Sequence, residues 1–282
     1  MKKVAIVGIF YDGYKDLWED FVVLFEKYWP DCPYKKFIIN QSAEFDLKSS
    51  FTVYHAGKDA EYSKKVQTAI EKIDADYYIL LLEDFFVERK VDGKKVEFVL
   101  DYLIDNGFNY CSMPLPEFKK SFKGKKQKNK MFLDISPKAE YTVSCQAAIW
   151  EKHFLKSCIG KENYNAWVFE GVYSKSKFAH SKAFLSKCCA TKSNPLNLRH
   201  GALQGKMIPK TMKRFKKNGY QMSTQREVLS TKLYFKHQLK SFLKSIVPLG
   251  LQKKIKKKIL LNSTIEKYNG EIERVMDSLG IF

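Results

Sequence analysis

The order of apolar runs and helical stripes along the first 106 residues constrains the fold more than any other feature of this sequence. Short strand-like runs occupy Val4–Phe10, Lys36–Asn40 and Thr52–His55. Between and after them, apolar residues recur at helical spacing over Tyr14–Trp29, Glu61–Ile73 and Val96–Asn106. This alternation predicts an α/β fold, in which helices flank a mostly parallel sheet.

The run Asp76–Val87, DYYILLLEDFFV, is the strongest candidate for a central strand, because it is apolar almost throughout. Glu83 and Asp84 interrupt it near its end. Burying an unpaired carboxylate is costly, and ligands of open α/β sheets bind beyond the carboxyl ends of the strands. Such a carboxylate can hold a divalent cation that bridges a diphosphate. The alternative is that the two residues only begin a loop or cap a turn.

The second part of the chain is less regular. Residues 117–130 hold seven lysines without an apolar period, which predicts a solvated loop. Beyond it we expect two strands, Ala139–Cys145 and Ala183–Ala190, and two helices, Gln146–Ile159 and Asn163–Phe178. An irregular segment follows from Asn194, and the last 60 or so residues suggest helices.

Bulk properties predict a cytoplasmic protein. The 282 residues are 45% hydrophobic, enough to bury a core. No apolar stretch reaches the roughly 18 residues of a spanning helix, and the short run after Lys3 is unlike a signal peptide. The six cysteines form no Cys-x-x-Cys pair, so we expect them to be reduced: Cys32, Cys111, Cys145, Cys158, Cys188 and Cys189.

The formal charge of +19 implies an anionic partner. Residues 231–262 hold nine lysines, no aspartate and no glutamate, and they contain two apolar stripes at helical spacing. A basic amphipathic helix of this kind lies in a lipid headgroup layer. We therefore predict a catalytic domain over residues 1–225 and a basic helical tail over 226–282 that attaches to an anionic membrane surface. The alternative is a helix that packs on the domain with its lysines in solvent.

Four segments together resemble the GT-A glycosyltransferases, especially the family-2-like bacterial enzymes of capsule and lipopolysaccharide assembly. They are VAIVGIFYDGY, YSKKVQTAIEKIDADYYILLLEDFF, YTVSCQAAIW and NAWVFE. The resemblance covers about residues 1–220 and implies a GT-A-like, Rossmann-like fold. It also implies transfer of a sugar from a nucleotide-sugar donor to a saccharide or lipid-linked acceptor, with inversion at the sugar.

The resemblance also assigns roles to individual residues. Phe10, Tyr11 and Asp12 would lie near the nucleobase, and Glu83 with Asp84 near the diphosphate and an Mg²⁺ or Mn²⁺ ion. The usual Asp-x-Asp motif reads Glu83-Asp84-Phe85 in this chain. Glu170 would act as the general base.

Several of these roles can also be weighed from the residues themselves. Glu170 follows Trp167, Val168 and Phe169, and an apolar setting raises a carboxyl pKa toward the value that suits a base. The alternative is a glutamate on a helix surface. The run Tyr62-Ser63-Lys64-Lys65 begins a predicted helix, where backbone N–H groups with hydroxyl and lysine side chains suit a phosphate; a capped surface helix is the alternative.

The remaining candidates concern the acceptor and the metal. Gln146, Trp150 and Trp167 are candidates for the acceptor side, because sugar rings stack on aromatic side chains; for Trp150 a place in the core is the alternative. His200 and Lys206 lie where GT-A enzymes often return a late residue to the metal or the diphosphate. His200 would ligate the ion and Lys206 would bind phosphate.

Three other functions remain open at this point. A nucleic-acid-binding protein would suit the charge, but no motif supports it and the charge gathers in one loop and one tail, so we expect no nucleic-acid partner. A sugar-phosphate nucleotidyltransferase would carry a glycine-rich basic signature that GIFYDGYKD lacks. An inactive relative that serves as a scaffold is the third.

Overall fold

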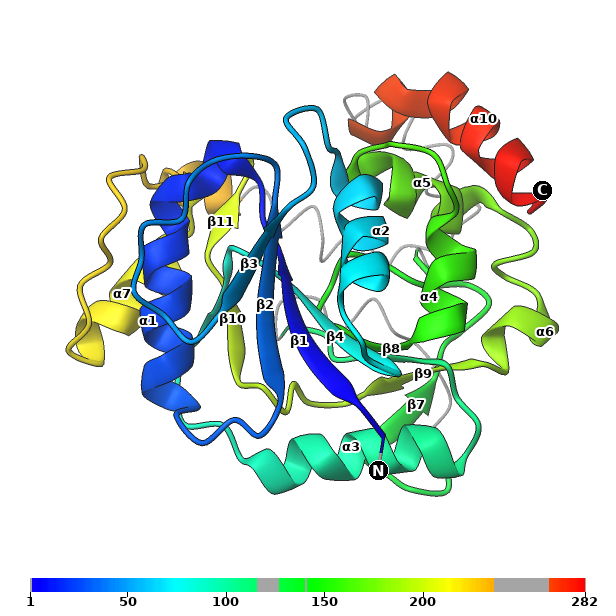
Figure 1. The fold of residues 1–282 in the computed structure, drawn as a ribbon, viewed down its shortest axis with the longest axis horizontal. Helices are drawn as coiled ribbons and strands as arrows, with labels where there is room; N and C mark the ends of the chain where they lie inside the picture. Colours follow the sequence, from blue (N-terminus) through cyan, green and yellow to red (C-terminus); the bar gives the residue numbers. More distant parts are fainter. Residues whose placement is uncertain (1, 116–126, 140, 236–263, 282) are drawn as a thin grey trace.

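A single large sheet with helices on both faces organises the protein (Figure 1). The computed structural model describes residues 2–115, 127–139, 141–235 and 264–281. Its sheet has eight strands in the order β3-β2-β1-β4-β8-β6-β9-β7. Their bounds are β1 Val4–Ile9, β2 Lys35–Asn40, β3 Thr52–His55, β4 Tyr77–Leu82, β6 Tyr110–Ser112, β7 Phe132–Asp134, β8 Ala148–Glu151 and β9 Cys188–Thr191.

The predicted α/β class with a mostly parallel sheet is confirmed. Strand β1 pairs in parallel with β2 and β4, and β2 pairs in parallel with β3. Only β8 and β7 run against the others. Two small sheets pair β5 (Phe85–Val87) with β10 (Leu198–His200) and β11 (Ala202–Leu203) with β12 (Lys206–Met207).

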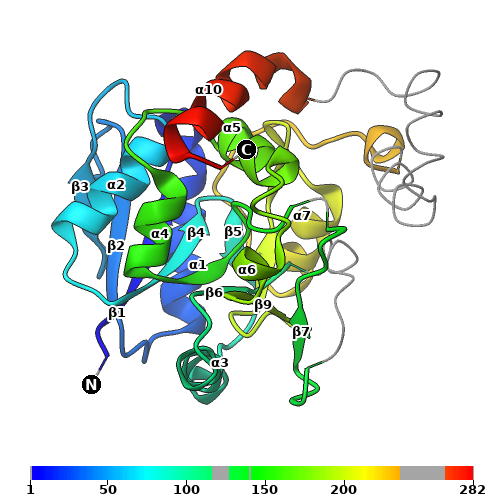
Figure 2. The same ribbon diagram turned by 90° about the vertical axis from the view of Figure 1, so that its right-hand side faces the viewer.

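Alternate residues of the central strands enter two apolar cores, one on each face of the sheet. Val7 and Ile9 of β1 contribute to the first core, and Ile6 contributes to the second. The helices are η1 Asp12–Leu17, α1 Trp18–Tyr28, α2 Tyr62–Lys72, α3 Gly93–Asp105, α4 Lys152–Ile159, α5 Ala166–Lys175, α6 Lys182–Leu185, α7 Pro209–Lys217, η3 Thr264–Tyr268 and α10 Asn269–Leu279. Helices α2, α4 and α5 cover the first core, and α1 and α3 cover the second (Figures 1 and 2).

The structure corrects four predicted elements. The predicted strand Ala183–Ala190 begins inside helix α6, and strand β9 starts only at Cys188. The run Asp76–Val87 is two strands in different sheets, because the chain turns at Glu83 and Asp84. No strand occurs within Ala139–Cys145 where the structure describes it. The predicted helix Gln146–Ile159 begins as strand β8, and α4 starts only after Glu151, whose carboxylate accepts hydrogen bonds from the backbone N–H groups of His153 and Phe154. A short, fully buried strand and a buried helix have the same apolar pattern.

The end of the chain belongs to the first core. Helix α10 lies along α5, and its Ile272, Val275 and Met276 are buried there. A Cβ atom on Gly171 of α5 would lie 2.3 Å from Ile272, so the two helices approach closely only because this residue is glycine. Residues 264–281 are therefore not separate from the predicted catalytic domain. Residues 236–262, most of the lysine-rich stretch, lie outside the described residues, as do residues 116–126 of the predicted loop.

No helix within the described ranges is long and apolar enough to cross a bilayer. The six cysteines are free, and only Cys32 is not fully buried.

Candidate functional site

The candidate site lies where β1 and β4 end, and a strand pair brings a histidine to it. Strand β10 pairs antiparallel with β5 so that His200 lies opposite Phe85. This register puts His200 Nε2 3.1 Å from Asp84 Oδ2. The backbone N–H of Gly201 donates to the carbonyl of Asp84 over 2.7 Å. The two residues predicted as metal ligands, Asp84 and His200, are thus neighbours, although 116 positions separate them.

Gly201 is required for this close approach. A Cβ atom there would lie 2.1 Å from the ring of Phe86 and 3.0 Å from the carbonyl oxygen of Asp84. Any larger residue would push β10, and His200 with it, away from the carboxylate.

Lys65, one of the residues predicted to bind phosphate at the start of α2, is buried and supplies positive charge to the site. Lys65 is 5% exposed, and its ammonium group donates to the carbonyl of Phe10 over 2.7 Å. It also lies 5.6 Å from the centre of the Tyr11 ring. The helical pattern could have revealed this burial: Tyr62, Lys65, Val66 and Ala69 are spaced to share one face of α2, and all four are buried.

The charges of the site are strongly coupled. Burial and the Asp84 carboxylate raise the pKa of Glu83 to about 8, while Lys65 and the backbone N–H of Tyr11 oppose that shift. Burial lowers the pKa of Lys65, and Glu83 opposes this change. Strongly shifted, mutually dependent groups at the end of a central strand are typical of functional sites.

Of the three residues predicted near the nucleobase, one presents its side chain to solvent. Tyr11 is 50% exposed. Phe10 is fully buried against Trp18 and Phe21, so its ring is not available to a ligand. Asp12 is committed to the fold as well, because its carboxylate accepts the backbone N–H groups of residues 41, 42 and 43.

Arg226 fixes the loop that carries Tyr11, a contact that the sequence did not reveal. Its guanidinium group binds the carboxylate of Asp16 and donates to the carbonyls of Gly13 and Gly205. It also stacks 3.9 Å from the centre of the Tyr14 ring. Burial and the Asp84 carboxylate raise the pKa of Tyr14, so this phenol faces Asp84 and Glu83.

Glu170 lies on α5. Asn165 caps the start of this helix, because its side chain accepts hydrogen bonds from the backbone N–H groups of Trp167 and Val168. One carboxylate oxygen of Glu170 accepts the backbone N–H of Cys145 over 3.1 Å. The Cys145 thiol and the Glu170 carboxylate act electrostatically on the Tyr62 hydroxyl, whose pKa lies well above its usual value mainly because of burial. Tyr62 and Lys65 are one turn apart on α2. Glu170 and Glu83 therefore act electrostatically on neighbouring positions of the same helix.

The structure buries Tyr62 at the predicted phosphate site at the start of α2. Its ring is buried against Phe169, with the ring centres 5.4 Å apart. The backbone N–H of Ser63 donates to the carbonyl of Tyr164 over 3.0 Å, so the protein itself satisfies this N–H group. Lys64 is partly exposed beside it.

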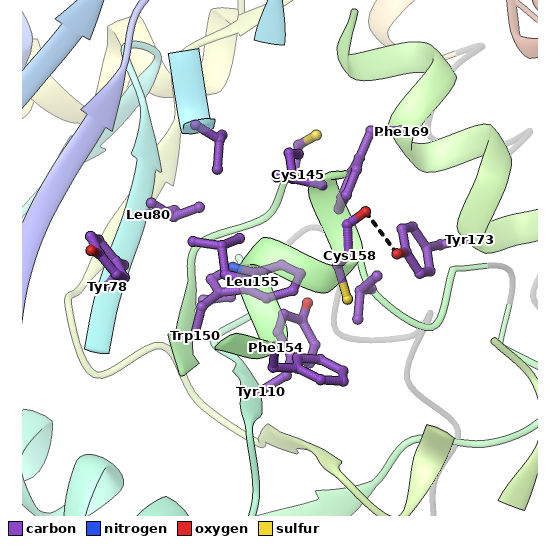
Figure 3. Close-up of a cluster of buried hydrophobic side chains, with 14 of the residues drawn as sticks. Tyr78, Leu80, Tyr110, Cys145, Trp150, Phe154, Leu155, Cys158, Phe169 and Tyr173 are labelled. Atoms are coloured by element: carbon purple, nitrogen blue, oxygen red, sulfur yellow. Dashed lines mark hydrogen bonds between the residues drawn. The ribbon is translucent and has the colours of Figure 1, made fainter. Parts of the chain in front are cut away.

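The structure separates the predicted acceptor residues. Trp150 is 1% exposed and packs on Tyr110 in the first core, so it cannot stack on a sugar (Figure 3). Trp167 is exposed on α5. Gln146 is half-buried, and its side-chain oxygen has no hydrogen-bond partner among the described residues. Lys206 pairs with Glu227 over 2.7 Å near the surface.

Asp84 and His200 fit a divalent cation only when a bound ligand supplies further coordinating atoms. Within the described ranges, no three His, Cys, Asp or Glu side chains are placed to hold a metal ion. Mg²⁺ commonly uses one or two carboxylates and completes its shell with waters and substrate phosphates. Asp84 and His200 therefore fit an ion that a diphosphate would complete.

Comparisons with known proteins find similar architectures. No family and no curated protein matches this chain. Residues 1–349 of S. aureus TarS are 10% identical with a TM-score of 0.42, over 67% of this chain and 58% of that one. The same TarS region in complex with UDP-GlcNAc is 10% identical with a TM-score of 0.41, over 61% and 53% of the two chains.

A third structure, CMP:2-keto-3-deoxy-manno-octonic acid synthetase complexed with CTP, is 13% identical with a TM-score of 0.37, over 55% of this chain and 76% of that one. This chain spans less than two thirds of the length of either TarS structure. At these TM-scores no residue role passes from these proteins to this chain.

Proposed function

We propose that this chain is a glycosyltransferase that binds a nucleotide-sugar donor at the ends of β1 and β4. The observation that carries the proposal is the group of buried Glu83, Asp84 and Lys65 with partly buried His200 beyond the central strand. Carboxylates in such a place need a partner, and among the described residues Lys65, His200 and Arg226 act on them. A diphosphate with its cation would complete the group.

The donor would lie across the first loop. The exposed ring of Tyr11 offers a surface on which a nucleobase can stack. The ammonium group of Lys65 lies beneath that ring and would attract the diphosphate. Asp84 and His200 would hold an Mg²⁺ or Mn²⁺ ion, which when bound supplies positive charge to the departing diphosphate.

Glu170 would act as the general base. Its carboxylate takes the proton of an acceptor hydroxyl, whose oxygen attacks the anomeric carbon on the face opposite the diphosphate. The bond from that carbon to the diphosphate breaks, and the nucleoside diphosphate leaves with the electron pair. The hydrogen bond from Cys145 holds the carboxylate in place, and Gln146 and Trp167 would line the acceptor side.

The acceptor would be a saccharide or a lipid-linked saccharide of a cell-surface polysaccharide. The lysine-rich stretch 231–262 would keep the enzyme on the cytoplasmic face of the membrane, where the headgroup of such an acceptor is accessible.

The direct test measures nucleoside diphosphate release from a panel of nucleotide sugars with and without Mn²⁺. We expect release from one donor, and its loss in Asp84→Asn. The control is Asp105→Asn, which removes an exposed carboxylate from α3. Equal release by wild type and Asp84→Asn would remove the site. Nucleotide binding without turnover, with every acceptor tried, would instead favour an inactive relative.

A further inference from the structure

The surface around α7 is unusually basic. Residues 206–235 contain eight lysines and arginines but one acidic residue, Glu227. Thr211 and Phe215 bury one face of α7 in the protein. Its lysines point away from that face and are exposed: Lys210, Lys213, Lys216 and Lys217. The helix is thus anchored on one side and presents a row of positive charge on the other.

Two nearby arginines form ion pairs within the protein, whereas the exposed lysines of α7 differ from them. Arg214 pairs with Glu88, and Arg226 pairs with Asp16. Within the described ranges, no carboxylate lies within ion-pair distance of Lys213, Lys216 or Lys217. Their charge is available to a partner outside the protein.

Large apolar side chains are exposed beside this row. Val228, Leu233 and Phe235 are 43%, 37% and 67% exposed. Their segment is fixed against the start of α7, because Leu229 donates its backbone N–H to the carbonyl of Met207 over 2.9 Å. Lys210 also lies 5.4 Å from the centre of the Tyr234 ring. Figure 2 shows this segment, in orange, on the same side of the molecule as α7.

We infer that α7 and residues 228–235 form a docking surface for an anionic lipid bilayer. Lysines attract anionic headgroups, while neighbouring exposed apolar side chains can enter the boundary of the acyl chains. Exposed Val228 and Leu233 favour a bilayer over a nucleic acid, which would offer them no apolar phase. The surface lies in the folded part of the chain, before residue 236, and its assignment does not depend on the reaction.

The test uses the full chain and sedimentation with vesicles of phosphatidylcholine, either pure or mixed with phosphatidylserine. The variant replaces Lys210, Lys213, Lys216 and Lys217 by glutamine. The control makes the same charge change at four exposed lysines elsewhere: Lys35, Lys94, Lys156 and Lys161. We expect the α7 variant to bind anionic vesicles at least about tenfold more weakly, and the control to lose less, because each lysine at the surface adds favourable energy.

A second variant, Leu233→Ser with Phe235→Ser, separates the apolar contribution. Both side chains are exposed, so the fold should persist, and an unchanged melting temperature verifies this. This variant should bind anionic vesicles more weakly than the wild type, with the same dependence on salt concentration. Equal loss in the α7 variant and the control would overturn the inference, as would equal binding to neutral and anionic vesicles. The α7 variant is also tested with duplex oligonucleotides. If it loses more oligonucleotide binding than vesicle binding, the surface would instead bind nucleic acid.

Discussion

Two places within six residues of each other hold buried carboxylates, Glu88 and the pair Glu83 and Asp84, and the side chains near them differ. Glu88, just after β5, has the guanidinium groups of Arg199 and Arg214 at 2.5 and 3.4 Å. Glu83 and Asp84, just before β5, are equally buried; among the described residues Lys65 and His200 lie near them, and Arg226 acts on Glu83 electrostatically. Burial and the Asp84 carboxylate raise the pKa of Glu83 to about 8.

The difference separates a structural ion pair from a site that can respond to a ligand. Arginine stays charged and matches a carboxylate with a planar fork, so Glu88 is satisfied by the fold and ties β5, β10 and α7 together. Burial raises the pKa of Glu83 and lowers that of Lys65, so the protonation of these two groups depends on their surroundings. The charge of Glu83 and Lys65 can therefore change when a diphosphate and its cation bind.

The largest expected effect concerns Asp84. Asp84→Asn should lower turnover by about 10³-fold, because it removes a carboxylate that would hold charge at the departing diphosphate. The melting temperature should stay near that of the wild type. Steady-state release of nucleoside diphosphate and a thermal melt measure the two effects. A large fall in stability with normal turnover would show that Asp84 behaves like Glu88.

Glu170→Gln should lower turnover by about 10²-fold, since the amide cannot accept the acceptor's proton. The amide oxygen can still accept the N–H of Cys145, so fold and donor binding should persist. Single-turnover kinetics measures the loss of turnover, and nucleotide titration measures donor binding. Turnover near that of the wild type would remove Glu170 from the mechanism, and a product with the donor's anomeric configuration would remove the inverting scheme.

Glu88→Gln should act on stability rather than on chemistry. It leaves two partly exposed guanidinium groups without their carboxylate, which we expect to cost about 2 kcal/mol in the free energy of unfolding. Nucleotide affinity at a temperature where the variant is folded should be almost unchanged. Denaturant titration measures the first quantity. A variant as stable as the wild type would contradict the structural role.

A further prediction concerns the pH dependence of stability that Glu83 causes without ligand. Its pKa is about 8 when folded and near 4.3 when unfolded, so the unfolded state loses the proton first as pH rises. The contribution to stability is complete below about pH 4 and is lost as pH rises through about 8. Glu83→Gln removes this loss and should make the protein more stable than the wild type at pH 9. The same slope of unfolding free energy against pH in both proteins would contradict the assignment.

The periodic elements could be predicted from the sequence because their patterns are local. Strand β3 has the predicted bounds, β1 ends one residue earlier than predicted, and α2 is shorter than predicted by one residue at each end. Strand β8 could not be told from a helix, since its three successive buried residues suit both. Long-range pairing was also beyond local patterns: the approach of His200 to Asp84 depends on β10 pairing with β5, and the contact of α10 with α5 depends on Gly171.

The site itself was predictable in part. The carboxylates stand out because they interrupt an apolar run, and this led to Glu83 and Asp84. Lys65 was predicted as one of the phosphate residues at the start of α2, but its burial was not, although its spacing puts it on the buried face. Trp150 has an aromatic ring suited to a sugar, but composition does not tell a core ring from an exposed one.

Hydrogen–deuterium exchange with saturating nucleoside diphosphate and Mg²⁺ tests the central claim most directly, because it locates the ligand. Ligand binding slows exchange where it stabilises local structure. We predict slower exchange in residues 9–16, 62–66, 82–86 and 198–202, with little change in α3. Asp84→Asn should weaken this protection, whereas Asp105→Asn should not. Protection confined to other segments, or none with UDP, GDP or CDP at millimolar concentration, would contradict a donor site at the ends of β1 and β4.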